Sequence, residues 1–269
     1  MKKRVMTAML GAVLAACGGG ADGGGDGDDD VFPVPSYPDP VPASPSQTMV
    51  LQSWLPTAVG LPDAPSAAAA LALASTTTLT SRLLGPSPLG FAAASAEPEA
   101  RLPAAGVGGD CVTVTATGIA FDHCESSLGG GITTITDGEV NVNADAGAVS
   151  WDLDITSVIA TQGLTSEARY HQSGDLTIAG GSIRGEMLAE LGATATSGQY
   201  TFDYAMSERV RLDLVFQASP ACVLSGTLEA QRVWTKRPEG YPPESTPDGA
   251  VLIEWSGCGE ATIATWTEG

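Results

Sequence analysis

The chain has 269 residues, of which 43% are hydrophobic, 6% aromatic and 16% charged. Its 31 acidic residues outnumber its 12 basic ones, so the net charge at pH 7 is −19. A surface this acidic repels polyanions, and nucleic acid and anionic head groups are therefore not expected as partners. The length allows one large domain or two small ones.

The first 16 residues have the three parts of an export signal. Lys2, Lys3 and Arg4 form a positive segment, and residues 5–16 (VMTAMLGAVLAA) form an uncharged apolar run. The run is too short to span a bilayer, and it ends in small residues that are typical of a signal-peptide cleavage site. Removing this segment takes away three of the 12 basic residues and none of the 31 acidic ones, so the mature chain has a net charge of 9 − 31 = −22.

The stretch Leu14-Ala15-Ala16-Cys17 follows the apolar run directly and resembles the lipobox of bacterial membrane lipoproteins. This resemblance covers residues 1–17 only. It implies that the Cys17 thiol receives a diacylglycerol, that the signal is removed before Cys17, and that a fatty acid such as palmitate acylates the new amine; two or more acyl chains anchor a protein stably. The resemblance thus implies a cell-envelope location, and Gly18 in place of Asp favours the outer membrane.

Residues 17–47 are predicted to be a disordered tether. Residues 18–30 (GGGADGGGDGDDD) contain almost nothing but glycine and aspartate, and residues 32–46 (FPVPSYPDPVPASPS) have proline at nearly every other position. Such a composition buries too little apolar surface to offset the chain entropy, and the prolines favour an extended polyproline II conformation. We expect this stretch to be dispensable for folding.

Residues 48–110 are predicted to contain one helix, over residues 65–84, followed by a second linker from residue 86 to residue 110. The helix is rich in alanine and leucine, and Gly85 lies at its expected end. An alanine-rich helix of this length is only marginally stable alone, so its leucines should pack on an apolar sheet face. These leucines are Leu71, Leu79 and Leu83.

From Cys111 onward, apolar and polar residues alternate. The apolar positions of three such runs are Val149, Trp151, Leu153 and Ile155; Tyr200, Phe202, Tyr204 and Met206; and Val210, Leu212, Leu214 and Phe216. Successive strand side chains point to opposite faces, so each run has one buried and one wet face. Residues 111–269 are therefore predicted to be mainly β: a large antiparallel meander of roughly ten to fourteen strands, curved or barrel-like, with a β-sandwich as the alternative.

Small and polar residues interrupt this alternation at about the spacing of hairpins. The predicted turns are at Gly118, Asp137-Gly138, Ser173-Gly174 and Ser197-Gly198. Three tryptophans near the C-terminus indicate that the last strands pack firmly: Trp234, Trp255 and Trp266.

Four cysteines remain after Cys17, and an even number in an exported protein predicts disulfides. A hairpin folded about Gly118 brings Cys111 towards Cys124, with a bulge or longer turn absorbing a one-residue slip. A long connection over residues 237–247 sets the flanking strands antiparallel and brings Cys222 towards Cys258. We predict these two pairs, each contributing about 2–4 kcal/mol. No CxxC pair or neighbouring histidine pair is present, so no metal site is expected.

No catalytic motif is recognisable around the two histidines. His123 precedes Cys124, but adjacent strand residues face opposite ways, so we expect a surface histidine beside a disulfide. His171 is expected at a strand end. Asp152 and Asp154 share a strand face, and paired carboxylates can do the work of a glycosidase, but the wet face of a sheet explains them more simply. We expect no catalytic residue, cofactor or metal, and motifs of serine hydrolases, zinc proteases and P-loops are absent.

These observations favour a lipid-anchored envelope protein whose β domain binds or supports another molecule, an apolar ligand or an envelope protein, without catalysis. Two alternatives stay open. One is a carrier that holds an apolar ligand or lipid in a curved-sheet cavity under the helix; the other is a hydrolase that uses only carboxylates and hydroxyls. A large apolar cavity favours the carrier, converging carboxylates in a polar cleft favour the hydrolase, and a filled core favours a structural role.

The lipid anchor yields the first testable prediction. Cys17→Ser should produce an unlipidated protein, because only the thiol forms the thioether to the diacylglycerol. Metabolic labelling of the bacterial cells with a fatty acid measures this, and equal label in the wild type and the variant would contradict it.

Overall fold

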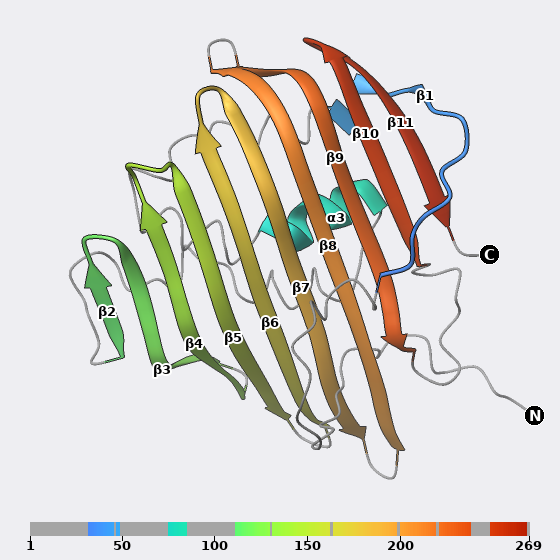
Figure 1. Ribbon diagram of the computed structural model, residues 1–269. Helices are drawn as coiled ribbons and strands as arrows, with labels where there is room; N and C mark the ends of the chain where they lie inside the picture. Colours follow the sequence, from blue (N-terminus) through green and yellow to red (C-terminus); the bar gives the residue numbers. More distant parts are fainter. Residues whose placement is uncertain are drawn as a thin grey trace, which may run out of the picture.

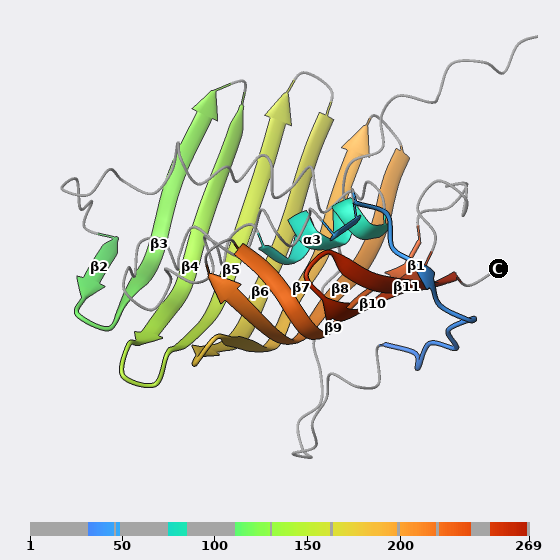
Figure 2. The same ribbon diagram turned by 90° about the horizontal axis from the view of Figure 1, so that it is seen from above.

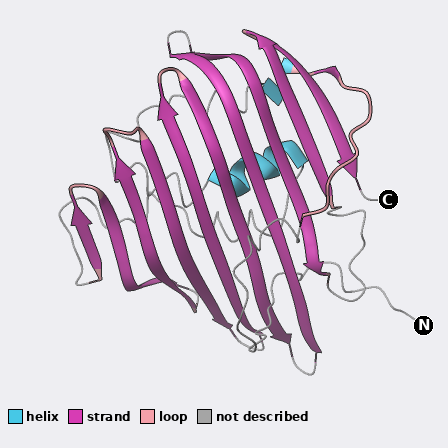
Figure 3. Ribbon diagram, in the orientation of Figure 1, coloured by secondary structure: helices cyan, strands magenta, loops and turns pink. Residues whose placement is uncertain are grey.

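The computed structural model describes residues 32–45, 47–48, 75–84, 111–129, 131–161, 164–197, 200–218, 221–237 and 248–267. Strands make up most of this part of the chain (Figure 3). In chain order the elements are β1 (Val41–Pro42), α3 (Ser75–Leu84), β2 (Val112–Thr115), β3 (Gly118–Gly129), β4 (Ile132–Asn143), β5 (Ala148–Thr161), β6 (Leu164–Ala179), β7 (Ser182–Ser197), β8 (Tyr200–Ala218), β9 (Ala221–Lys236), β10 (Gly249–Gly257) and β11 (Glu260–Thr267).

The strands form one 11-stranded antiparallel sheet. From β2 to β11 each strand pairs with the next one along the chain, and β1 then pairs with β11 (Figure 1). This confirms the predicted antiparallel meander. The sheet is curved, with α3 on its inner side (Figure 2). The edge strands β1 and β2 do not pair with each other, so the sheet does not close. A single sheet also rules out the β-sandwich alternative.

The period-two pattern divides the sheet into two faces of opposite character. On β8, Met206, Val210 and Leu214 are buried and point to the same side as Glu208, which contacts α3, whereas Asp213 on the other side is exposed. We call the side towards α3 the concave face and the opposite side the convex face. Apolar side chains line the concave face from β3 to β11, including Phe121, Val140, Leu153, Tyr170, Met187, Leu212, Leu228, Ile253 and Ile263.

The two other runs and the late tryptophans follow the same rule where their side chains are described. On β5, Val149, Trp151, Leu153 and Ile155 are all buried, and on β8 Tyr204 and Met206 are buried. Trp234 and Trp255 lie in the core on β9 and β10, and Trp266 is half-buried. The C-terminal strands are thus packed as the sequence predicts.

Two of the predicted turns are wrong: Asp137-Gly138 lies inside β4, and Ser173-Gly174 lies inside β6. Gly174 is opposite Trp151 on β5, and a Cβ atom there would lie 2.3 Å from the indole ring. The glycine therefore makes room for a large cross-strand neighbour and does not end a strand. The Ser197-Gly198 prediction is consistent with the end of β7 at Ser197, and Gly118 begins β3 directly after the β2–β3 turn.

Residues 32–43, which we call the N-terminal strap, run from β9 around the edge strand β11 (Figure 1). At the edge, Val41 and Pro42 pair with Ile263 and Thr262, and the Ala43 N–H donates to the Ala261 carbonyl at 2.8 Å. The structure therefore places residues 32–43 against the sheet, where a disordered tether was predicted, and the dispensability of this segment for folding stays a prediction. Each proline removes one backbone N–H donor, but Phe32 and Tyr37 supply side-chain contacts that hold the strap. Residues 17–31 lie outside the described residues.

The strap packs on the convex face through two aromatic side chains. The Arg209 guanidinium lies 4.4 Å from the centre of the Phe32 ring, and Phe32 is 4% exposed. The Tyr37 hydroxyl donates to Glu229 Oε1 at 2.7 Å; burial, together with the Glu229 carboxylate, raises the pKa of Tyr37, so the hydroxyl stays a donor throughout the physiological range. Cation–π and hydrogen-bond contacts therefore join the strap to β8 and β9.

The strap can be tested by comparing two of its own residues. Phe32→Ala should lower the free energy of unfolding by about 2–3 kcal/mol, because it removes a buried ring and the cover of Arg209. Val34→Ala is the matched control, since Val34 is 95% exposed, and it should change the stability by less than about 0.5 kcal/mol. Denaturant unfolding measures both, and equal stabilities of the two variants would show that the strap is not part of the fold.

Candidate functional site

The helix α3 lies on the concave face over β7, β8, β9 and β10 (Figure 2). Leu79 is 1% exposed and belongs to the core, and Leu83 packs against it. The predicted packing is thus confirmed for these two leucines, whereas Leu71 and residues 65–74 lie outside the described residues. The segment Ser75–Leu84 contains three consecutive threonines and is a poor helix by propensity, so its contacts with the sheet stabilise it.

A buried ion pair holds the helix at one position. Glu208 on β8 and Arg232 on β9 are cross-strand partners, both side chains are fully buried, and Arg232 Nε lies 2.6 Å from Glu208 Oε1. The Thr80 hydroxyl donates to Glu208 Oε2, and Arg232 Nη1 donates to the Leu84 carbonyl at 3.5 Å. The Glu208–Arg232 pair thus binds α3 at two places. One is the middle of the helix, and the other is its C-terminal end, where the last carbonyls have no partner within the helix.

The concave face also extends across β3, β4, β5 and β6. Its side chains there are apolar and buried: they include Ile119, Phe121, Val140, Val149, Trp151, Leu153, Ile155, Tyr170, Leu176 and Ile178. We call this surface the β3–β6 trough wall. The helix α3 packs over β7–β10, and the residues of the β3–β6 trough wall belong to the same buried apolar cluster as Leu79.

Trp151 and Ser166 each place a buried polar atom in the apolar β3–β6 trough wall. Trp151 Nε1 and Ser166 Oγ have no hydrogen-bond partner among the described residues, although their side chains are only 3% and 2% exposed. Ser166 pairs with Ile159 on β5, eight residues from Trp151, so the two positions are up to about 27 Å apart at 3.4 Å per strand residue. A buried polar group without a partner costs about 1–3 kcal/mol, so each is a place where a hydrogen-bonding group would stabilise the protein.

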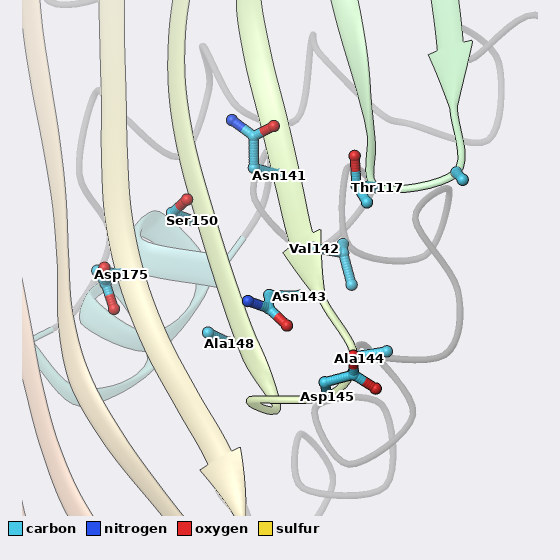
Figure 4. Close-up of a pocket in the computed structure, with 10 residues that line it drawn as sticks. Thr117, Asn141, Val142, Asn143, Ala144, Asp145, Ala148, Ser150 and Asp175 are labelled. Atoms are coloured by element: carbon cyan, nitrogen blue, oxygen red, sulfur yellow. The ribbon is translucent and has the colours of Figure 1, made fainter.

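A pocket of about 630 Å³ lies at the β4–β5 turn (Figure 4). It is lined by Ala116, Thr117, Asn141, Val142, Asn143, Ala144, Asp145, Ala148, Ser150 and Asp175. Its two carboxylates, Asp145 and Asp175, are exposed and lie on opposite sides of the pocket in Figure 4. The arrangement therefore does not bring two carboxyl groups to one reacting atom, as a carboxylate-based hydrolase requires.

The predicted cysteine pairs are together in space. Cys111 and Cys124 have a Cα–Cα distance of 5.2 Å and form a disulfide, and Cys222 and Cys258 form another at 5.6 Å. One extra residue of β3, between Phe121 and Cys124 in its pairing with β4, lies just beyond the β2–β3 ladder and brings Cys124 level with Cys111. The predicted bulge thus absorbs the slip. Cys17, the predicted lipid attachment residue, lies outside the described residues.

The polar residues considered for catalysis all lie on the convex face. His123 is exposed beside Cys124, as predicted, and Asp152 and Asp154 are exposed on β5. The prediction that His171 is at a strand end is wrong, because it lies in the middle of β6. The two inward positions that follow it are Gln172 and Gly174, and these two residues hid the apolar alternation that marks a strand.

Comparison with protein families, with characterised proteins and with solved structures found no match to this chain. Within the part of the chain that the structure describes, no helix is long and apolar enough to cross a membrane. The function therefore has to be inferred from the chain itself.

The buried pair under α3 gives a prediction about stability. Arg232→Met should lower the free energy of unfolding by about 3–5 kcal/mol, because it leaves the Glu208 charge buried and uncompensated. The double variant Glu208→Leu/Arg232→Met should recover most of this loss. Arg184→Met is the control, since the Arg184–Asp213 pair is exposed and is worth at most about 1 kcal/mol. If the double variant were less stable than Arg232→Met, the pair would not act as we describe.

Proposed function

We propose that this chain is a lipid-anchored protein of the cell envelope whose curved sheet binds an amphiphilic, acyl-chain-bearing ligand on its concave face without catalysing a reaction. The observation that carries this proposal is the β3–β6 trough wall, an apolar part of the concave face in which two buried polar atoms have no hydrogen-bond partner among the described residues. An apolar surface with a few fixed polar groups is what a small-molecule site for such a ligand needs.

The chemistry of the ligand follows from the wall. Its aliphatic and aromatic side chains suit an acyl chain, which contributes about 0.8 kcal/mol for each buried CH₂ group. The Trp151 indole N–H is a donor only and suits a carbonyl or carboxylate oxygen of the ligand, whereas the Ser166 hydroxyl both donates and accepts. A ligand with an apolar body and polar groups satisfies both atoms, and a pure hydrocarbon satisfies neither.

The predicted anchor on Cys17 supports the same ligand class. A protein held at a membrane surface by acyl chains is next to the most abundant amphiphiles of the cell. The acidic chain repels anionic head groups, so the apolar part of the ligand, and not its charge, supplies the affinity.

A purely structural domain is the second candidate. The observation that favours it is the complete burial of Val140, Val149, Leu153 and Leu176, since a filled core is also the outcome of packing without a ligand. The two candidates differ in whether a ligand can be recovered with the protein.

Tryptophan quenching tests the proposal on the Cys17→Ser protein. Fatty acids brominated along the chain should quench its fluorescence, and Trp151→Phe should remove most of that quenching, because Trp151 lies in the proposed site. Trp266→Phe is the matched control, since Trp266 is on β11 at the far side of the sheet, and it should leave the quenching in place. Native mass spectrometry of the same protein should show a bound amphiphile. No quenching and no bound mass would favour the structural candidate.

A further inference from the structure

Both histidines of the chain lie in one row across the convex face. Asp137 on β4 is directly opposite Asp154 on β5, and Asp154 is directly opposite His171 on β6. At the other end of the row, the His123 backbone N–H donates to Asp137 Oδ1 at 2.5 Å, and His123 Nδ1 lies 3.8 Å from Asp137 Oδ2. Four strands thus bring together two imidazoles and two carboxylates that are far apart in the sequence.

The donor atoms around His171 converge. Its Nδ1 is 3.2 Å from Asp154 Oδ1 and 3.8 Å from Asp152 Oδ1, and the ligand atoms of the three residues all lie within 4.8 Å of one another. The two aspartate side chains are 72% and 71% exposed and His171 is 33% exposed, so an ion from solvent reaches all three.

The charges in this part of the face are not balanced. Asp137 opposes Asp154, and Glu139 opposes Asp152, so two pairs of like charges are direct cross-strand neighbours, an arrangement that destabilises a sheet. Among the described residues, Asp152 and Asp154 each form an ion pair with His171. On β7 and β8, by contrast, Glu186 is paired with Arg211.

We propose that His171, Asp152 and Asp154 bind one first-row divalent cation, with Zn²⁺ as the representative ion. Zinc binds imidazole nitrogen and carboxylate oxygen at 2.0–2.2 Å, which puts tetrahedral ligand atoms about 3.4 Å apart. The separations of 3.2 and 3.8 Å from His171 Nδ1 already approach this value. Small rotations of exposed side chains complete the set, and water takes the remaining position.

The donor set also selects among ions. Calcium and magnesium prefer oxygen ligands only, whereas an imidazole nitrogen favours zinc and its first-row neighbours. The two positive charges of the cation offset the negative charges of Asp152 and Asp154. They thereby reduce the repulsion of these residues by their cross-strand neighbours Glu139 and Asp137. The His123 imidazole lies beside Asp137 and is not among the three residues whose ligand atoms converge, so it is not proposed as a ligand of this ion. The site is on the convex face and does not depend on the ligand proposed for the concave one.

Calorimetric titration of the metal-free Cys17→Ser protein with ZnCl₂ tests the site. We expect one equivalent to bind, and we expect His171→Asn and Asp154→Asn each to weaken binding at least tenfold. Asp213→Asn is the matched control for Asp154→Asn, because it removes the same charge from an exposed position of the same face; His123→Asn is the control for His171→Asn. Both controls should bind zinc within about twofold of the parent protein.

Three outcomes would overturn the proposal. The first is the absence of saturable zinc binding to the parent protein. The second is an equal loss in Asp213→Asn and Asp154→Asn, which would mean that zinc responds only to the general acidity of the face. The third is CaCl₂ binding as tightly as ZnCl₂ with no effect of His171→Asn, which would mean that the imidazole does not coordinate the ion. Circular dichroism of each variant shows that the exposed substitutions leave the sheet intact.

Discussion

An open sheet with one apolar face has to bury that face against something other than another sheet. In this protein the constraint is severe, because the strands from β3 to β11 present apolar side chains on one side and the sheet does not close. Curvature brings the two ends of the face towards each other, and α3 occupies part of the interior (Figure 2). The buried Arg232–Glu208 pair then decides where the helix sits, since two desolvated charges are stable only with their full set of partners.

The open edges are the second consequence of this architecture. An edge strand exposes unpaired N–H and C=O groups, which invite pairing with other chains. At one edge the strap pairs with β11 through β1, and at the other the short strand β2 is joined to β3 by the Cys111–Cys124 disulfide. The second disulfide ties β9 to the end of β10 near the strap-covered edge. The strap and the disulfides thus protect the edges of this open sheet, whereas a barrel has no edges because it is closed.

The two faces then serve different chemistry. The concave face is apolar and buried, and we assign it an amphiphilic ligand, whereas the convex face is charged and exposed, and we assign it a cation. Strand geometry permits this division because neighbouring residues belong to opposite faces. Trp151 and Asp152, for example, are consecutive, yet one lies in the proposed ligand site and the other in the proposed metal site.

The sequence by itself determined the elements whose signals are local. Alternation of period two predicts the strands and their buried sides, and the symmetry of two hairpins predicts both disulfides, because register in a meander follows from the chain order. Gly138 and Gly174 misled the prediction of turns, since the neighbour that requires Gly174 to be small, Trp151, is on another strand.

Only the tertiary structure decided what depends on residues far apart in the chain. Glu208 and Arg232 look like residues of a wet strand until α3 is placed over them, and the strap resembles a proline-rich tether until Phe32 meets Arg209. Likewise, His171 is separated from Asp154 by 17 positions, and no short motif links them. The physical reason is that burial and electrostatic pairing depend on distances in space, and an alternating sequence specifies only which face a side chain is on.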